Sequence, residues 1–374
     1  MLKTLVLPLI ATITFACSSD YVIWIPRSKS ADPLYRFIKN EKAGYIDRGG
    51  RVVIKPKFDT YGNYGSEFHD GLLEISLSDG RYVDRTGKIV IDKGFNRGWD
   101  FSEGLAVVMR KGEDVWGYID TSGQFVISPR FATVPNGYVH PFSDGLAMIE
   151  VKGKLGYIDR SGEFVIKPQF LDATSFSEGM ARVVMEGPCV YFPDGACAST
   201  KFVGGKESDH PPSCKFTYID KTGRVITSAR FDGARDYSEG LAPVQIGELW
   251  GFIDRTGAVV IAPRFRDAEP FSSDLSRIQD PGLYGFVDKS GAIRISPRFK
   301  YAENFSEGFA VVGDGGDKVW YIDQQGHQAI EGRFYAASQF FRGLAHVQLR
   351  ATDASEGRAS FAYIDTKGHR VFEY

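Results

Sequence analysis

Nine aspartates recur along this chain at nearly regular intervals, and a ladder of aligned carboxylates could bind calcium. They are Asp47, Asp84, Asp120, Asp159, Asp220, Asp254, Asp288, Asp323 and Asp365. A glycine stands three positions after each of them: Gly50, Gly87, Gly123, Gly162, Gly223, Gly257, Gly291, Gly326 and Gly368. Asp-x-x-Gly between two β-rich runs is typical of a hairpin turn, in which Asp caps backbone N–H groups and Gly adopts the left-handed conformation. The pattern therefore favours nine capped turns over a metal ladder.

Two further rows of charge repeat with the same period. Acidic residues stand in a Ser-Glu-Gly corner, and basic residues stand inside a Pro-x-Phe motif. The acidic row is Asp70, Glu103, Asp144, Glu178, Glu239 and Glu307, and the basic row is Lys57, Arg130, Arg230, Arg264 and Arg298. We interpret the two rows as ion pairs between neighbouring repeats on a solvated surface, each of small energy. The functional alternative is a basic stripe that binds phosphate or lipopolysaccharide groups.

Other patterns with chemical potential are weak. The histidines lie far apart and form no metal-binding spacing; they are His69, His140, His210, His327, His346 and His369. No pair of carboxylates stands out from the repeat, as glycoside hydrolysis would require. The glycines occupy turns, and none is organised to hold a phosphate. The sequence predicts no catalytic residue, no cofactor and no metal ligand, and hence a protein that is not an enzyme.

One region is unique to a single repeat: an insert over residues 186–215 that contains Cys189, Cys197 and Cys214. In an exported protein these cysteines are candidates for a disulfide. Cys189–Cys214 is favoured because both lie next to paired strands, and Cys189–Cys197 is the alternative. A zinc site with His210 is disfavoured by the exporting compartment. A loop that projects from a regular array could contact a partner, or it could be a tolerated insertion.

The N-terminus predicts export. Residues 1–16 have a positive start, a short apolar run and a small-residue exit, which is the pattern of a signal peptide. The run is too short to span a bilayer. Cleavage after Ala16 would leave Cys17 first, as in a bacterial lipoprotein, although ordinary cleavage at the same bond is the alternative. Residues 17–33 then form a tether, and the lipid on Cys17 would hold the protein to a membrane of the cell envelope.

The repeat that carries these residues is roughly 35 residues long. Each unit contains a strand that follows the corner, a Tyr-Ile-Asp strand, the Asp-x-x-Gly turn and a Val-Ile strand. Pro-x-Phe should end the hairpin, because proline cannot continue a central strand, and should return its Phe to the core. Residues 34–374 thus form an all-β array of nine three-stranded antiparallel meanders. We expect a curved or superhelical array, with a closed propeller-like ring as the alternative.

Composition agrees with a folded repeat protein. The 374 residues are 43% hydrophobic, and 42 glycines and 17 prolines are placed periodically, which indicates turns and not disorder. The formal net charge of −2 comes from interspersed residues of both signs. Such a balance does not favour nucleic acid as a partner.

As a combination, these motifs resemble the WG-repeat family of bacterial β-repeat proteins, from about Gly44 to Tyr374. The Trp-Gly pair itself occurs at Trp116-Gly117 and Trp250-Gly251. The resemblance implies a β-repeat array in envelope or secreted proteins and implies no shared catalytic residues.

The resulting hypothesis is a non-enzymatic envelope protein whose repeat surface binds a protein or a glycan. The alternatives are a hydrolase that acts on cell-wall polymer and a purely structural spacer. An enzyme should break the repeat with polar residues gathered in one place, and the sequence indicates no such break outside the cysteine insert.

Overall fold

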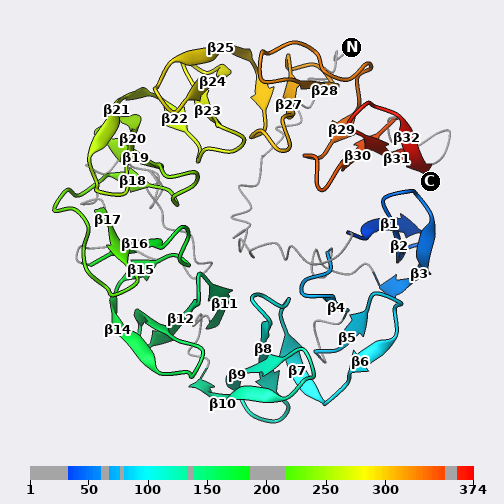
Figure 1. Cartoon of the computed structure of the whole chain (residues 1–374), viewed down its shortest axis with the longest axis vertical. Helices are drawn as coiled ribbons and strands as arrows, with labels where there is room; N and C mark the ends of the chain where they lie inside the picture. The colour runs from blue at the N-terminus through cyan, green and yellow to red at the C-terminus, as the bar shows by residue number, and fades with distance from the viewer. Residues whose placement is uncertain (1–32, 60–66, 76–79, 133–138, 186–214, 350–359) are drawn as a thin grey trace, which may run out of the picture.

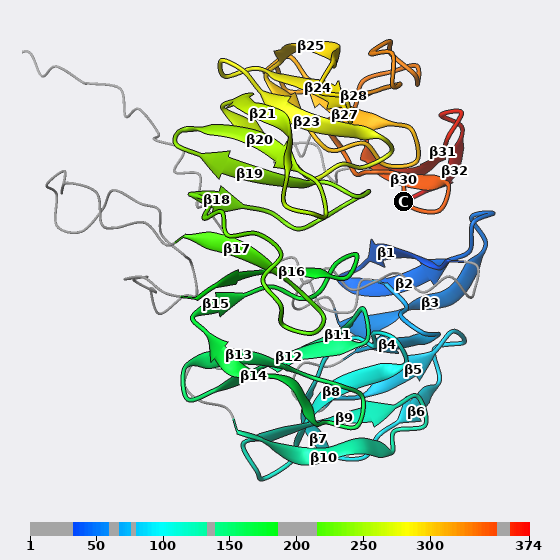
Figure 2. The same cartoon turned by 60° about the vertical axis from the view of Figure 1, so that its left-hand side comes forward.

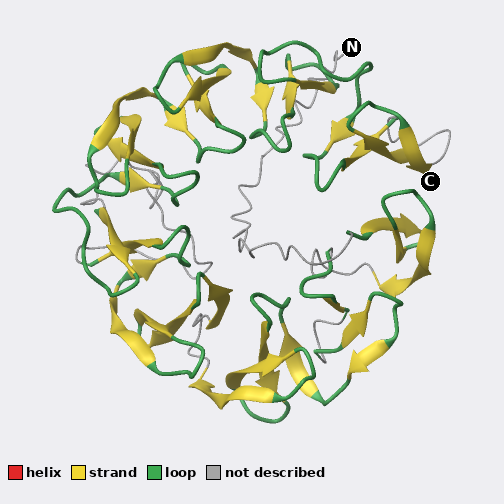
Figure 3. Ribbon diagram, in the orientation of Figure 1, coloured by secondary structure: helices red, strands yellow, loops and turns green. Residues whose placement is uncertain are grey.

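The computed structural model of the protein describes residues 33–59, 67–75, 80–132, 139–185, 215–349 and 360–374. Within these ranges the chain forms nine antiparallel sheets of three or four strands and no helix, and so no helix that could cross a membrane. Figure 3 shows strands and loops alone around the whole molecule. The prediction of an all-β array of nine units is confirmed. We number the units 1 to 9 by their Asp-x-x-Gly turns.

Each unit contributes the predicted strands. The strands that follow the corners are β1 (Tyr35–Lys39), β4 (Leu72–Glu74), β8 (Leu105–Arg110), β12 (Leu146–Val151), β16 (Met180–Val184), β19 (Ala242–Ile246), β23 (Leu275–Gln279), β27 (Ala310–Gly313) and β30 (Leu344–Gln348). The Tyr-Ile-Asp strands are β2 (Lys42–Ile46), β5 (Tyr82–Asp84), β9 (Val115–Asp120), β13 (Lys154–Ile158), β17 (Phe216–Asp220), β20 (Leu249–Ile253), β24 (Tyr284–Asp288), β28 (Val319–Ile322) and β31 (Phe361–Asp365).

The third strand of most units lies at the outer rim of the molecule in Figure 1. These outer strands are β3 (Val52–Asp59), β6 (Ile89–Ile91), β10 (Phe125–Ala132), β14 (Phe164–Phe170), β21 (Val259–Phe265), β25 (Ile293–Phe299) and β32 (Arg370–Glu373). In units 5 and 8 isolated bridges such as Phe216–Phe231 and Val319–Phe334 take the place of this strand.

A fourth, short strand was not predicted. It comes from the segment between Pro-x-Phe and the corner, which we had expected only to join units, and it pairs with the strand after the corner. These strands are β7 (Phe95–Gly98), β11 (Val139–Ser143), β15 (Asp172–Ala173), β18 (Gly233–Ala234), β22 (Asp267–Ala268), β26 (Tyr301–Ala302) and β29 (Ala336–Ala337). A four-stranded order such as β22-β23-β24-β25 therefore runs from the inner side of the molecule to its rim (Figure 1).

The prediction that proline ends the hairpin was wrong. Pro168 lies inside β14, where the register with β13 shifts between the pairs Leu155–Phe170 and Tyr157–Ile166. An outer strand needs no N–H donor toward solvent, so proline is accepted there in a bulge. The return of Phe170 to the core is confirmed, since it is buried.

The bulged backbone crosses directly over Gly156, where an added Cβ would stand 2.6 Å from Ile166 O and 2.6 Å from Pro168 N. This crossing explains the glycine of the Trp-Gly motif.

The units follow one another around a ring, as Figures 1 and 2 show. Each turn glycine packs against a side chain of the preceding unit's third segment, such as Gly291 against Ile261 and Gly326 against Ile295. The same contact joins the last unit to the first, because Gly50 lies against Val371. The array is therefore curved, as predicted, and it closes into the propeller-like ring that was given as the alternative.

Aromatic side chains complete the closure between units 9 and 1. The Tyr35 hydroxyl donates to Arg342 O at 2.8 Å, and the Tyr363 hydroxyl donates to Arg36 O at 2.6 Å. Phe37 packs edge-on against Phe372 with ring centroids 4.9 Å apart. No strand is shared across this junction within the described residues, so side-chain packing and hydrogen bonds hold it.

Several sequence predictions fall outside the described residues. These are the signal peptide at 1–16, cleavage at Ala16, lipidation of Cys17, nearly all of the tether at 17–33, and the cysteines Cys189, Cys197 and Cys214. The insert is placed only by its neighbours: β16 and β17 flank it, and their residues Val184 and Phe216 are paired.

Candidate functional site

The Asp-x-x-Gly turns are capped as predicted in all nine units. In unit 6, Asp254 Oδ1 accepts hydrogen bonds from Thr256 N at 2.8 Å and Ala258 N at 3.1 Å, and Gly257 has φ of 83°. A hydroxyl two positions after the aspartate adds a further donor in six units. In unit 5 that hydroxyl, on Thr222, lowers the pKa of Asp220 to about 2. These carboxylates serve their own turns. Among the described residues no group of three or more His, Cys, Asp or Glu could hold a metal ion.

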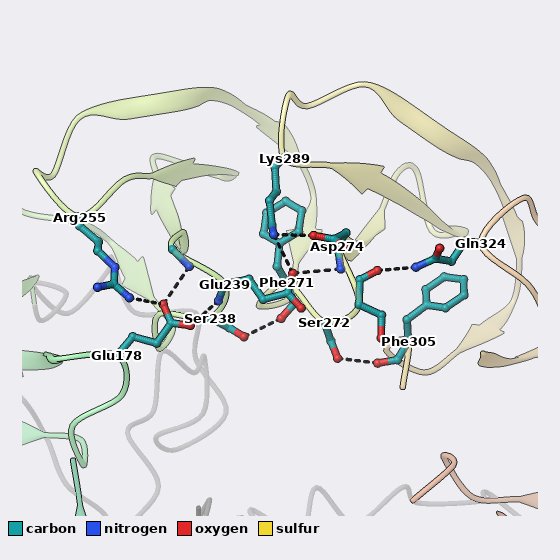
Figure 4. Close-up of polar contacts among 12 residues, drawn as sticks. Glu178, Ser238, Glu239, Arg255, Phe271, Ser272, Asp274, Lys289, Phe305 and Gln324 are labelled. Atoms are coloured by element: carbon teal, nitrogen blue, oxygen red, sulfur yellow. Dashed lines mark hydrogen bonds and ion pairs between the residues drawn. The ribbon is translucent and has the colours of Figure 1, made fainter. Parts of the chain in front are cut away.

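The acidic residues of the corners bind backbone of the next corner. Glu178 Oε1 accepts from Glu239 N at 2.6 Å, and its Oε2 accepts from Gly240 N at 2.8 Å (Figure 4). Carboxylates reach the next corner in the same way from Asp70 to Gly104, from Glu103 to Gly145, from Asp144 to Gly179, from Glu239 to Asp274 and from Glu307 to Gly343. Five corner glycines, and Asp274 in the equivalent position of unit 7, are thereby tied to the unit before them. We call this series the corner ladder.

The corner serines form a second series of bonds in the same direction. Ser238 Oγ donates to Phe271 O at 2.6 Å, and Ser272 Oγ donates to Phe305 O at 2.6 Å (Figure 4). The acceptor is the carbonyl of the aromatic residue that opens the next corner. Burial of a polar group without a partner would cost free energy, so these bonds favour one spacing between units.

The predicted ion pairing between the two charged rows was wrong. Four of the five basic residues donate to the carbonyl of the next turn glycine, as Lys57 Nζ does to Gly87 O at 2.7 Å and Arg298 Nη2 to Gly326 O at 2.7 Å. The fifth, Arg230, donates to carbonyls of its own segment, such as Ser228 O at 3.2 Å. Some corner acids do form ion pairs across units, but with the residue that follows the turn aspartate. An example is Arg255 Nη2 and Glu178 Oε2, 2.9 Å apart. Sequence spacing showed both rows of charge. It could not show that the nearest partners of each row are backbone groups and not the side chains of the opposite row.

Repeat symmetry breaks at a set of charged residues in units 5 to 8, on the short strands, the segments that follow them and the strands after the corners. We call this set the arginine arc: Asp172, Arg182, Arg235, Asp236, Asp267, Glu269, Arg277 and Glu303. These elements lie on the inner side of the ring, away from the outer strands β21 and β25 (Figure 1). The sequence prediction that no such break exists outside the cysteine insert was therefore wrong.

Within the arc each arginine links two units. Arg182 Nη1 donates to Ala234 O at 2.8 Å, and Arg235 and Arg277 donate in the same way to Ala268 O and Ala302 O. Glu269 Oε1 lies 3.2 Å from Arg235 Nη1 and 3.0 Å from Arg277 Nη2, so one carboxylate joins two guanidinium groups.

Aromatic rings lie beneath these guanidinium groups. Arg235 lies 4.6 Å from the ring centroid of Trp250, and Arg277 lies 5.0 Å from that of Tyr284. The side chains of Arg235 and Glu269 are 29% and 21% exposed, so the arc is reachable from solvent. Burial raises the pKa of Asp172, and the neighbouring Arg182 opposes that rise. The arc can offer alternating charge and hydrogen-bonding groups to a partner.

A second break lies in unit 2 and at the start of unit 3. His69 stands where the corners of units 3 to 8 carry serine, and its Nε2 is 3.9 Å from Asp100 Oδ2. Burial raises the pKa of Asp100 to about 7, with Glu67 adding to the rise. Its Oδ1 is buried and has no hydrogen-bond partner among the described residues. Asp236 holds the equivalent position in unit 6, where Arg182 opposes the rise in pKa that burial causes. A carboxyl group that can be neutral near pH 7 is suited to donate a proton.

The other histidines do not gather. Desolvation of His140, which is half-buried, lowers its pKa to about 4. His346 Nε2 lies 2.8 Å from the Tyr374 hydroxyl, near the junction of the ring. His327 and His369 stand at Asp-x-x-Gly turns beside Asp323 and Asp365, and His210 lies outside the described residues.

Sequence reasoning missed the arc, although a signal was present. The third residue after the corner is apolar in units 3 and 8 (Val107, Val311) but is Arg182 in unit 5 and Arg277 in unit 7. From unit 3 to unit 8 these two arginines carry the only charge in this column of the sequence, which marks a unit-specific site; outside these units the column holds Glu74 and His346. Asp100 gave no comparable signal, because Asp236 occupies the same column.

Comparison with known proteins identifies the repeat. The family model described as "WG containing repeat" matches residues 44–71, 81–113, 116–154, 156–187, 216–250, 250–280 and 284–316, which is more than half of the chain. No curated protein sequence matches the chain.

Solved structures with a similar outline are distant in sequence. Kluyveromyces lactis Hsv2 is 10% identical with a TM-score of 0.35, over 78% of this chain and 94% of that one. Virginiamycin B lyase from Staphylococcus aureus is 10% identical with a TM-score of 0.30, over 79% and 92%. The C-terminal WD40 domain of Sif2 is 9% identical with a TM-score of 0.36, over 71% and 78%. TM-scores this low add no support for the ring beyond the contacts between units described above.

Proposed function

The chain belongs to the WG containing repeat family, whose repeated β architecture suggests a binding or structural role, and we propose that it is a non-enzymatic envelope protein whose ring binds a protein or glycan partner. The observation that carries the proposal is that the repeated polar residues hold the ring together by hydrogen bonds. Turn aspartates, corner acids and corner serines form hydrogen bonds within their turns or to the next unit. Residues that hold the ring together are not available for a reaction.

The arginine arc is the part of the ring that we assign to the partner. It is charged, partly exposed and restricted to neighbouring units, as expected of a recognition surface and not of a repeated structural contact. The charge of both signs favours a polar partner.

Site-specific photo-crosslinking in the native envelope tests this assignment. A benzoylphenylalanine replaces Tyr301, which is 42% exposed in β26 beside Glu303, or Val126, which is 48% exposed on the outer strand β10. The two sites are matched in exposure. We expect a discrete cross-linked product from position 301, identified by mass spectrometry as protein or glycan. Equal products from both positions, or none from either, would refute the assignment.

We also propose that a lipid on Cys17 anchors the protein to a membrane of the cell envelope. The support is the sequence pattern of residues 1–17 alone. Mass spectrometry of the mature N-terminus should show an acylated Cys17, and an unmodified residue would contradict the anchor.

In the same sample, peptide mapping without reduction should recover the Cys189–Cys214 disulfide. The Cys189–Cys197 pairing would instead place the bond inside the insert.

A hydrolase that acts on cell-wall polymer is the second candidate, and Asp100 favours it. A carboxyl group with a pKa near 7, beside His69 and Glu67, is suited to general acid catalysis. The test incubates the protein with isolated cell-wall polymer and compares Asp100→Asn with Asp236→Asn, which alters the equivalent position of unit 6. Release of soluble fragments by the unchanged protein and by Asp236→Asn, but not by Asp100→Asn, would establish the enzyme and end the non-enzymatic proposal.

A further inference from the structure

The corner ladder shows that a corner of this fold binds a carboxylate. In the turn at Glu239 and Gly240 both residues have left-handed φ, 54° and 89°, so their two N–H groups point to the same side. Glu178 accepts from both, at 2.6 and 2.8 Å (Figure 4). Glu307 accepts in the same way from Arg342 N and from Gly343 N, the latter at 2.8 Å. Two units thus contain the same two-point contact between a corner and a side-chain carboxylate.

The corner of unit 8 has the same geometry. Glu307 and Gly308 have φ of 53° and 86°, and Ser306 pairs with Phe309 to close the turn. The preceding corner, however, carries Ser273 where units 2 to 6 and unit 8 carry Asp or Glu. A serine is too short to reach across two units. Within the described part of the chain, neither Glu307 N nor Gly308 N has a hydrogen-bond partner.

The surroundings of this corner leave room for a ligand. Glu307 is exposed and Gly308 is half-buried. No atom beyond its chain neighbours lies within 4 Å of where a Cβ on Gly308 would stand, so the turn is open. The carboxylate of Asp274, in the preceding corner, is paired with Lys289 at 2.7 Å, which limits its repulsion of an incoming anion.

A third donor stands at the position from which other units bind the corner carboxylate. Arg255 and Lys289 occupy this position in units 6 and 7, and Gln324 occupies it in unit 8. Gln324 Nε2 donates to Ser273 O at 2.6 Å (Figure 4), and the amide group carries a second N–H. The donors around this corner are therefore neutral but aligned.

We propose that Glu307 N and Gly308 N form a binding site for the carboxylate of an aspartate or glutamate side chain on a protein partner. A carboxylate is the group that the same turn holds in other units, and there its source is an acidic side chain of a protein. This inference rests on the proposed partner-binding function and names one contact of it.

Titration of the amide signals tests the proposal directly. The protein is labelled with ¹⁵N-glycine, and the Gly308 signal is assigned by its loss in Gly308→Asn, since asparagine tolerates the left-handed conformation. The probe is the blocked tripeptide acetyl-Ser-Glu-Gly-amide, with acetyl-Ser-Gln-Gly-amide as its uncharged match. We expect the Glu peptide to shift the Gly308 signal in a saturable way, the Gln peptide to do so at least several-fold more weakly, and the Gly240 and Gly343 signals to stay in place.

Ser273→Glu provides the decisive variant, because it restores the internal carboxylate and should remove binding of the Glu peptide. Gln325→Glu adds the same charge to an exposed residue of unit 8 and should leave binding unchanged. Unchanged binding to Ser273→Glu, no saturable shift of Gly308, or a shift by glucuronate without one by the peptide would overturn the site. A cross-link from position 301 that persists while the peptide fails would refute this site and leave the proposed function standing.

Discussion

The corner ladder and the arginine arc use charged residues in different ways. In the ladder each carboxylate accepts backbone N–H groups of the next corner, and the same bond recurs from unit to unit, as from Glu103 to Gly145 and from Asp144 to Gly179. In the arc, guanidinium groups and carboxylates pair with one another and are confined to units 5 to 8. The contrast teaches that repetition marks the contacts that build this ring, whereas departure from it marks the surface that distinguishes this chain.

The largest expected effect comes from the glycine under the bulge. Gly156→Ala should lower the free energy of unfolding by about 3 kcal/mol or more, or prevent folding, because the new methyl group meets the backbone of Ile166 and Pro168 at 2.6 Å. The matched control is Gly153→Ala in the same hairpin, where open space limits the loss to about 1 kcal/mol from its positive φ. Chemical denaturation measures both. Equal losses would show that the crossing imposes no constraint.

The turn glycine should have the next largest effect. Gly162→Val should cost about 2–3 kcal/mol, because φ is 85° and the added Cβ would meet Ile127 Cγ2 at 2.9 Å. Gly112→Val has a similar φ of 80° but no atom within 4 Å, so it isolates the cost of the backbone conformation. The difference in melting temperature between the two variants reports the contact between units. No difference would argue against tight packing of the turn on the preceding unit.

Outside the repeated contacts, a substitution at Asp100 should stabilise the protein, whereas the two glycine substitutions should destabilise it. A rise in pKa from 3.8 to about 7 penalises the charged form of Asp100 by about 4 kcal/mol in all, at about 1.4 kcal/mol per unit. The buried amide of Asp100→Asn offsets about 1–3 kcal/mol of that, so the variant should be more stable near pH 8 by about 1–3 kcal/mol. The penalty is absent below pH 3.8 and grows as pH rises toward 7, so the gain should follow that window. Asp236→Asn should gain less, because Arg182 favours its charged form. Destabilisation by Asp100→Asn at pH 8 would contradict the assigned pKa.

The corner ladder should show a smaller loss with the opposite pH dependence. Burial alone would raise the pKa of Glu178, but hydrogen bonds from Arg255 and from the N–H groups of Gly240 and Glu239 lower it. Its stabilisation is therefore present above the ordinary value of 4.5 and is lost as pH falls below it. Glu178→Gln should cost about 1–2 kcal/mol at pH 7 and nearly nothing below pH 4. A loss that does not change with pH would mean that charge plays no part in the ladder.

Much of the architecture could be read from local patterns. The nine Asp-x-x-Gly turns and the buried Phe of Pro-x-Phe follow from backbone preferences of residues such as Gly162 and from the apolar character of Phe170. The ring could not be chosen over an open array, because closure depends on small rotations between units. It is fixed by contacts such as Gly50 with Val371, more than 300 residues apart in sequence.

The candidate site was less accessible from sequence. The partner of Glu178 is a pair of backbone N–H groups, and a sequence displays no backbone, so opposite charges were matched instead. Arg182 and Arg277 were visible as the two charged residues of their column in units 3 to 8, but only the sheets place them next to Ala234 and Ala302. Ser273 stood out only as a departure from the corner motif, and its meaning required the geometry of the corner after it.

Native-state hydrogen exchange of the corner glycine amides tests most directly whether the repeated carboxylates join the units. Five of these amides donate to a carboxylate: Gly104, Gly145, Gly179, Gly240 and Gly343. We predict that at neutral pH all five exchange roughly tenfold or more slowly than Gly308, which has the same turn but no such acceptor among the described residues. Equal exchange rates at Gly308 and at the other five would contradict the account.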